Sequence, residues 1–191
     1  VHLRGLAEGL SKPRLVARAI WGMGKLDAGG DDLAAILTQL NAILQPAMLV
    51  PFTSQELSNT LWGLARIGSS DARCRCHAER LVLRIIGESG KRLGALTSQC
   101  LANSLWAVAK LGVRGAAASD FAASCLAEMC RECRLSSFST QGLANSLWAC
   151  ARLQLEEELA SAFCIAVSRE VTEDRLASFM PQELSMAVWA V

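Results

Sequence analysis

Apolar positions recur along this chain with the spacing of one face of an α-helix. In the segment 53–68, Leu57, Leu61 and Leu64 lie within ~60° of one another at ~100° per residue. The opposite side of the segment carries two amides, an indole and a cation: Gln55, Asn59, Trp62 and Arg66. The small residues between these sides, Ser58, Thr60 and Gly63, allow another helix to approach closely. The pattern predicts an amphipathic helix with two distinct faces.

The same pattern is repeated along the chain. The polar stripe recurs as Gln99, Asn103, Trp106 and Lys110, then as Gln141, Asn145, Trp148 and Arg152. Weaker copies are Arg14, Arg18, Trp21 and Lys25 near the start, and Gln182, Met186 and Trp189 near the end. The five tryptophans are 41, 44, 42 and 41 residues apart. A rare residue at a near-constant interval indicates a duplicated structural unit.

Each unit is predicted to be a hairpin of two helices. The expected A helices lie near 12–26, 53–68, 97–112, 139–154 and 181–191, and the expected B helices near 31–45, 71–89, 116–134 and 156–175. Ser/Thr pairs at 53–54, 97–98 and 139–140 offer N-caps, and Phe52, Leu96, Phe138 and Phe179 can pack on the first turns. Gly68 and Gly112 are the expected left-handed C-caps.

The predicted fold is all-α: an α-solenoid of stacked two-helix repeats of 41–44 residues, forming a single array over 1–191. Its last repeat stops soon after Trp189, so we expect the chain to be a fragment of a longer protein. The high hydrophobic content of 52% agrees with helices that bury two sides. The longest uncharged run, 33–55, contains Pro46 and Pro51, which argues against a membrane span.

The net charge and the arrangement of possible metal-binding and catalytic residues argue against several classes of function. The net charge is only +1, which is unfavourable for a strong nucleic-acid footprint. Eight cysteines without regular spacing suggest small buried side chains in a reducing compartment. The pairs Cys74/Cys76 and Cys130/Cys133 would bind zinc only if the two pairs met, so we expect no metal and no cofactor. No nucleophile–base pair or paired carboxylates are present, and we expect no catalytic activity.

The polar stripe has two interpretations. In the first, the amides read base edges, the indoles stack on bases and the cations hold the phosphates of single-stranded RNA. In the second, the amides bond the backbone of the adjacent repeat and the indoles fill the seam between repeats. Residues that read different bases must differ between repeats, so the identity of Asn59, Asn103 and Asn145 favours the second interpretation for the amides and indoles.

The cations of the stripe are better candidates for RNA contact. Sequence-independent phosphate contacts should repeat, as do the cations of the A helices: Lys25, Arg66, Lys110 and Arg152. The alternative is a solvated helix end at which positive charge favours the helix dipole. One position does vary near the start of each A helix, as Glu56, Cys100, Gly142 and Glu183. Any base-reading code is expected there.

The segment 101–112, Leu-Ala-Asn-Ser-Leu-Trp-Ala-Val-Ala-Lys-Leu-Gly, resembles the core of octotricopeptide repeats. It is also similar to the helical repeats of organellar proteins with FAST-kinase-like and RAP domains. The resemblance implies a non-catalytic α-solenoid that acts on RNA in mitochondria or chloroplasts, in transcript stabilisation, processing or translation. The alternative is a protein-binding scaffold or peripheral subunit of a large organellar complex, which the near-neutral charge favours.

Overall fold

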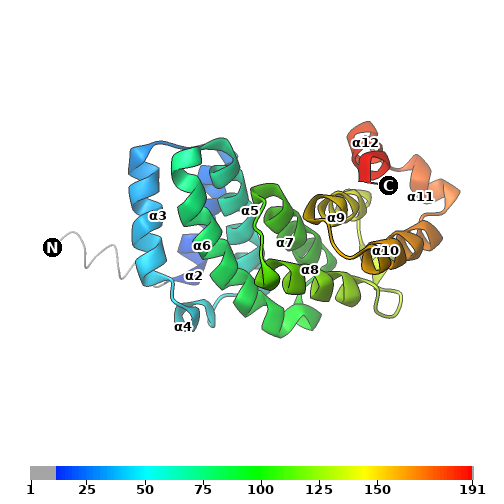
Figure 1. Ribbon diagram of the computed structural model, residues 1–191, viewed down its shortest axis with the longest axis horizontal. Helices are drawn as coiled ribbons and strands as arrows, with labels where there is room; N and C mark the ends of the chain where they lie inside the picture. The colour runs from blue at the N-terminus through cyan, green and yellow to red at the C-terminus, as the bar shows by residue number, and fades with distance from the viewer. Residues whose placement is uncertain (1–11, 191) are drawn as a thin grey trace.

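The part of the chain that the structure describes, residues 12–190 of a computed structural model, is helical and contains no strand (Figure 1). The A helices are α2 (Pro13–Lys25), α5 (Ser54–Ser70), α7 (Ser98–Leu111), α9 (Thr140–Leu153) and α12 (Pro181–Ala190). The B helices are α3 (Asp31–Ile43), α6 (Ala72–Ser89), α8 (Ala116–Met129) and α10 (Glu157–Glu170). The all-α prediction is confirmed. Residues 1–11 and Val191, which the expected array includes, lie outside the described residues.

Short helical turns occupy the connections between one hairpin and the next. They are α4 (Pro46–Leu49), η1 (Gly90–Ala95), η2 (Arg134–Ser137) and α11 (Glu173–Ala177). The predicted B helices 116–134 and 156–175 are therefore too long. The first ends at Met129, and Cys133 beyond it has a positive φ of 54°, which an α-helix does not tolerate.

The A helices begin where the hydroxyl caps were predicted. Thr97 and Ser139 accept hydrogen bonds from the amides of Cys100 and Gly142 at 3.2 and 3.1 Å. At α5 the cap is reciprocal, because Glu56 also accepts from the Thr53 amide at 2.8 Å. The apolar residues just before these caps, Phe52, Leu96 and Phe138, are all buried.

The two glycines expected to end A helices behave differently. Gly112 is the left-handed C-cap of α7, with φ of 74°. The prediction for Gly68 is wrong, because α5 continues to Ser70. Gly68 is instead a packing residue: a Cβ there would come within 2.6 Å of a Leu111 methyl group. Close contact with the next repeat, and not a turn, explains this glycine.

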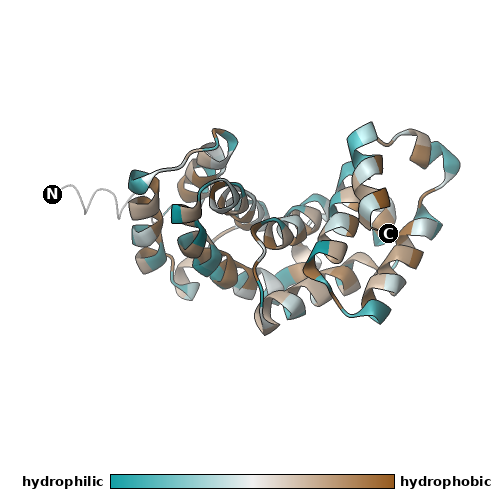
Figure 2. Ribbon diagram, turned by 45° about the horizontal axis from the view of Figure 1, so that its top comes forward, coloured by the Kyte–Doolittle hydropathy of each residue, from teal (hydrophilic) through white to brown (hydrophobic). Residues whose placement is uncertain are grey.

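The helices pack in the order of the sequence, and each A helix contacts the A helix of the next hairpin. Gly24 and Gly63 let the backbones of α2 and α5 touch, since a Cβ on Gly63 would lie 2.5 Å from the Ile20 carbonyl oxygen. Between α5 and α7, the buried Ser58 hydroxyl donates to the Cys100 carbonyl at 3.3 Å. Neighbouring B helices pack less extensively. The row of helices therefore bends into the arc seen in Figure 2.

Candidate nucleic-acid interface

Four of the five tryptophans form a continuous row across the A helices. The ring centroids of Trp21 and Trp62 are 6.3 Å apart, those of Trp62 and Trp106 also 6.3 Å, and those of Trp106 and Trp148 6.5 Å. The middle pair is stacked, with 20° between the ring planes, and the outer pairs are tilted. Trp62, Trp106 and Trp148 are half-buried. These indoles contact one another between repeats and remain partly accessible to solvent.

The amides of the stripe do not bond the adjacent repeat's backbone, so that expectation is wrong for residues 12–190. The Gln55 amide donates to Asn59 Oδ1 at 2.9 Å, within the same helix. The Cys100 thiol, from the next repeat, contacts Gln55 Oε1 at 3.5 Å. The side chains of Asn103 and Asn145 make no hydrogen bond to any described residue, although both are half-buried. Their donors and acceptors are available to a ligand.

A groove of about 710 Å³ runs along this face and is lined by residues of α5, α7, α9 and α12. It contains the unpartnered amides of Asn103 and Asn145 beside the ring of Trp106, and Met186 of α12 forms part of its wall. Because helices two and three repeats apart line one groove, the A helices form the inner side of the arc (Figures 1 and 2). A smaller pocket of about 320 Å³ continues the groove between the starts of α7 and α9.

The four cations of the stripe are not equivalent, contrary to expectation. Arg66 forms an ion pair with Asp27 and donates to the Gly24 carbonyl at 3.5 Å. Lys25 lies 5.6 and 5.7 Å from the ring centroids of Trp21 and Trp62.

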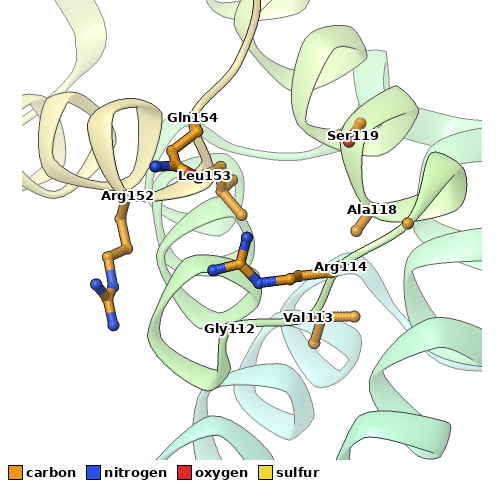
Figure 3. A pocket seen from close by; sticks show the side chains of 9 residues that line it. Gly112, Val113, Arg114, Ala118, Ser119, Arg152, Leu153 and Gln154 are labelled. Carbon is orange, nitrogen blue, oxygen red and sulfur yellow. The ribbon is translucent and has the colours of Figure 1, made fainter.

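Lys110 and Arg152 are exposed and, within the described part of the chain, pair with no carboxylate. Figure 3 shows Arg152 and Arg114 extending from neighbouring segments at the ends of α9 and α7, where they line a pocket of about 210 Å³. Arg114 was not among the predicted contact residues. Of the stripe cations only Arg66 lines the groove, and Arg152 and Arg114 line this separate pocket near the ends of α9 and α7.

The position that varies between repeats is buried or bonded to the helix start in α5, α7 and α9. Cys100 is 1% exposed, and Gly142 is buried and has no side chain. Glu56 accepts hydrogen bonds from the amide and hydroxyl of Thr53, and Glu183 accepts from the Met180 amide at 2.9 Å. The position varies with the chemistry of the helix start in α5, α7 and α9, whereas at α12 Glu183 also lines the groove.

The cysteines divide by burial. Cys74, Cys100, Cys125 and Cys150 are buried, whereas Cys76, Cys130 and Cys133 are exposed. Burial raises the pKa of Cys150 to about 11 and also raises the pKa of Cys125. Across residues 12–190, no three His, Cys, Asp or Glu side chains gather in a way that would hold a metal ion. None of the described helices is both long and apolar enough to cross a membrane.

Sequence analysis missed a set of arginines in the connections between hairpins. Arg92 donates to the Phe52 carbonyl at 2.9 Å, and Arg134 and Arg175 donate to the matching carbonyls of Leu96 and Phe138. A glutamate of the preceding B helix holds each arginine: Glu88, Glu128 and Glu170. The signal was present, because each arginine precedes a bulky apolar residue by four positions, in Arg-Leu-x-Ala/Ser-Leu/Phe. Their partners show a structural role.

Comparison of the chain with protein-family models, with curated proteins and with solved structures found no match. The function is therefore inferred from the geometry of the A-helix face. That face combines a row of indoles and a groove with two unpartnered amides, and two unpaired cations lie at the ends of α7 and α9.

Proposed function

We propose that the chain is an α-solenoid of two-helix repeats of 41–44 residues, similar to octotricopeptide repeats, which binds single-stranded RNA along the inner face of its A helices. The proposed role is non-catalytic and lies in the stabilisation, processing or translation of mitochondrial or chloroplast transcripts. The resemblance of segment 101–112 supports the family and the compartment. The geometry of the groove supports the ligand.

The observation that carries the proposal is the pair of amides at Asn103 and Asn145. Both lie in the groove without a hydrogen-bond partner among the described residues, and the half-buried ring of Trp106 lines the same groove. A half-buried amide that bonds no protein group is suited to a polar ligand, and base edges present the matching donors and acceptors. The half-buried ring of Trp106 adds aromatic contact that does not depend on base identity.

The near-neutral net charge is compatible with RNA binding because the acidic residues near the groove are engaged. Asp27 is paired with Arg66, and Glu56 and Glu183 accept hydrogen bonds from the backbone at helix starts. Lys110 and Arg152 have no such partners in the described part of the chain. These two cations, at the ends of α7 and α9, are therefore free to contact phosphates although the whole chain carries only +1.

Charge reversal tests the proposal. The triple variant Arg66→Glu, Lys110→Glu and Arg152→Glu should weaken binding of single-stranded RNA at least tenfold. Each lost phosphate contact should also reduce the slope of log K against log salt by ~0.7. Fluorescence anisotropy over a salt series measures both quantities.

The matched control reverses two exposed arginines of the B helices, Arg80→Glu and Arg169→Glu, which pair with no carboxylate among the described residues. This control should leave RNA binding nearly unchanged, apart from the long-range effect of net charge, which salt screens. Equal losses in the two variants, or no loss in either, would show that the inner face does not bind the phosphates.

A second candidate function, protein binding, is favoured by a different surface. An apolar groove of about 670 Å³ lies among α9, α10, α11 and α12. It is lined by exposed aliphatic side chains, including Ile165, Leu176 and Val188. Such a groove fits the apolar face of an amphipathic helix from a partner protein.

A further inference from the structure

Four amide side chains of α7 and α9 line two adjoining hollows of the inner face. The groove of about 710 Å³ and the pocket of about 320 Å³ between the starts of these helices share all four: Gln99, Asn103, Gln141 and Asn145. None of these amides forms a side-chain hydrogen bond with another described residue. Each therefore keeps an acceptor oxygen and an NH₂ donor for a ligand.

The amide positions of the neighbouring A helices differ from those of α7 and α9. In α5, the Gln55 amide donates to Asn59 Oδ1 at 2.9 Å and its oxygen accepts from the Cys100 thiol at 3.5 Å. Neither Gln55 nor Asn59 lines the groove. In α12 the asparagine position holds Met186, so Gln182 has no companion amide on its helix. Among the described A helices, paired free amides of two helices line one space only between α7 and α9.

The residue at position 142 explains why the amides of α7 are free. Gly142 occupies in α9 the repeat position that Cys100 occupies in α7. The Cys100 thiol engages the glutamine of the preceding repeat, whereas Gly142 has no side chain that could engage Gln99. Gly142 also lines the pocket of about 320 Å³. A Cβ there would lie 3.4 Å from its nearest neighbours, Phe138 and Ser139, so a small side chain fits but takes up pocket space.

We infer, on the basis of the proposed function, that the inner face reads one nucleobase of the bound RNA between α7 and α9, at a site that Gly142 opens. An Asn or Gln amide can form two hydrogen bonds with one base edge, and an unstacked base of a single strand exposes that edge. The neighbouring nucleotides are held whatever their bases. Trp62 and Arg66 of α5 offer them aromatic and cationic contacts, and Met186 of α12 offers an apolar contact.

Single substitutions in uniform RNA strands test this inference on the purified 191-residue chain. Two labelled host strands of equal length, one of uridylates and one of cytidylates, each receive one different nucleotide at the centre, and anisotropy titrations compare them. At least one base should tighten binding of a host about fivefold or more, as expected for a base held by an amide. A second copy of that nucleotide beside the first should add no more than about twofold, the statistical gain from a second alignment. A similar gain from every added copy would overturn the inference, because it would show reading at several repeats.

Gly142→Cys is the matching protein variant, since it gives α9 the side chain that α7 carries at this position. It should reduce the gain from the preferred nucleotide to less than about twofold, while the host strand itself binds within about threefold of its original affinity. Urea unfolding checks the fold, and stability should not fall, because cysteine has a higher helix propensity than glycine. An undiminished gain in a folded Gly142→Cys protein would overturn the inference.

Two further variants complete the test. Asn103→Ala removes one reading amide and should also diminish the gain. Gln39→Ala is the control, because it removes an exposed amide of α3 that lines neither hollow, and it should leave the gain unchanged. If no strand bound the original protein, the proposed function would fail together with the inference. Binding of the hosts without any preference for a base would overturn the inference alone.

Discussion

At the scale of the residue, the repeated tryptophan is the side chain whose role the structure defines most clearly. Trp106 lies between the rings of Trp62 and Trp148 and is half-buried. Trp189 is 61% exposed and stacks on no aromatic ring of the described residues. The same residue type therefore serves as a structural spacer inside the row and as a solvent-exposed group at its end. Position in the row, and not residue type, decides the energetic contribution of each indole.

Trp106→Ala should destabilise the protein by about 3 kcal/mol, because it removes a large side chain from between two aromatic neighbours. Trp189→Ala is the control and should change stability by less than about 1 kcal/mol, as expected for an exposed side chain. The free energy of unfolding, measured by urea titration, compares the two variants. A small effect of Trp106→Ala on stability, together with lost RNA affinity, would instead mark the indole as a ligand platform.

At the scale of the element, helix starts followed from the sequence, whereas several helix ends, those of α5, α8 and α10, did not. The starts depend on bonds within four residues, such as the Ser139 hydroxyl with the Gly142 amide, so local sequence is sufficient. The ends depend on neighbours distant in the chain. Gly68 and Gly112 occupy the same position of the repeat, yet only Gly112 forms a cap, since Gly68 packs against Leu111 of the next repeat.

The connections between hairpins show the same limit of local reasoning. Arg92 bonds the Phe52 carbonyl, 40 residues earlier in the chain, and no local pattern indicates such a partner. Only the recurrence of Arg-Leu before a bulky apolar residue in successive repeats could have indicated this contact. The contact satisfies a carbonyl where the chain turns into the next A helix. Glu88 lies beside this arginine. It accepts hydrogen bonds from Lys91, which has the larger effect, and from Arg92, and these bonds lower the pKa of its carboxyl group.

The glycines of the helices provide a test of close helix packing. Gly63→Ala would place a Cβ 2.5 Å from the Ile20 carbonyl oxygen and should destabilise the protein by about 2 kcal/mol, since backbone atoms cannot move aside as a side chain can. Gly87→Ala, in the interior of α6, meets nothing within 4 Å. It should stabilise the protein by about 0.5–1 kcal/mol through helix propensity.

Thermal and urea unfolding of the two glycine variants give the signs directly. Opposite signs are the expected result. If Gly63→Ala also stabilised the protein, α2 and α5 would not be in backbone contact, and the tight inner row of A helices would lose its main support.

At the scale of the whole molecule, the groove is a property of curvature that the sequence did not reveal. The stripe residues on each A helix were predicted, including Asn103, Asn145 and Lys110. Met186 of α12 and Trp62 of α5 line one groove because the row of helices bends far enough to bring these helices to the same groove. This bend is the sum of small differences between tight A-helix contacts and looser B-helix contacts. No single residue indicates it.

The apolar groove among α9, α10, α11 and α12 predicts how the chain behaves in solution. Val188 is 77% exposed there, beside the exposed Ile165 and Leu176, and such patches promote association. Val188→Glu should therefore reduce both binding of a hydrophobic dye and self-association in sedimentation experiments. The unfolding free energy should change by less than about 0.5 kcal/mol, because the side chain is already in solvent.

Val50→Glu is the control, since Val50 is 58% exposed and lies away from this groove, beside α4. A charge at Val50 should leave dye binding and association unchanged. Equal effects of the two substitutions would show that the reduced association results from the change in net charge. An effect of Val188→Glu alone would place the self-associating surface at α12. The groove proposed to bind RNA is lined by other residues of α12, so Val188→Glu should also leave RNA affinity intact, which separates the two candidate binding surfaces in one variant.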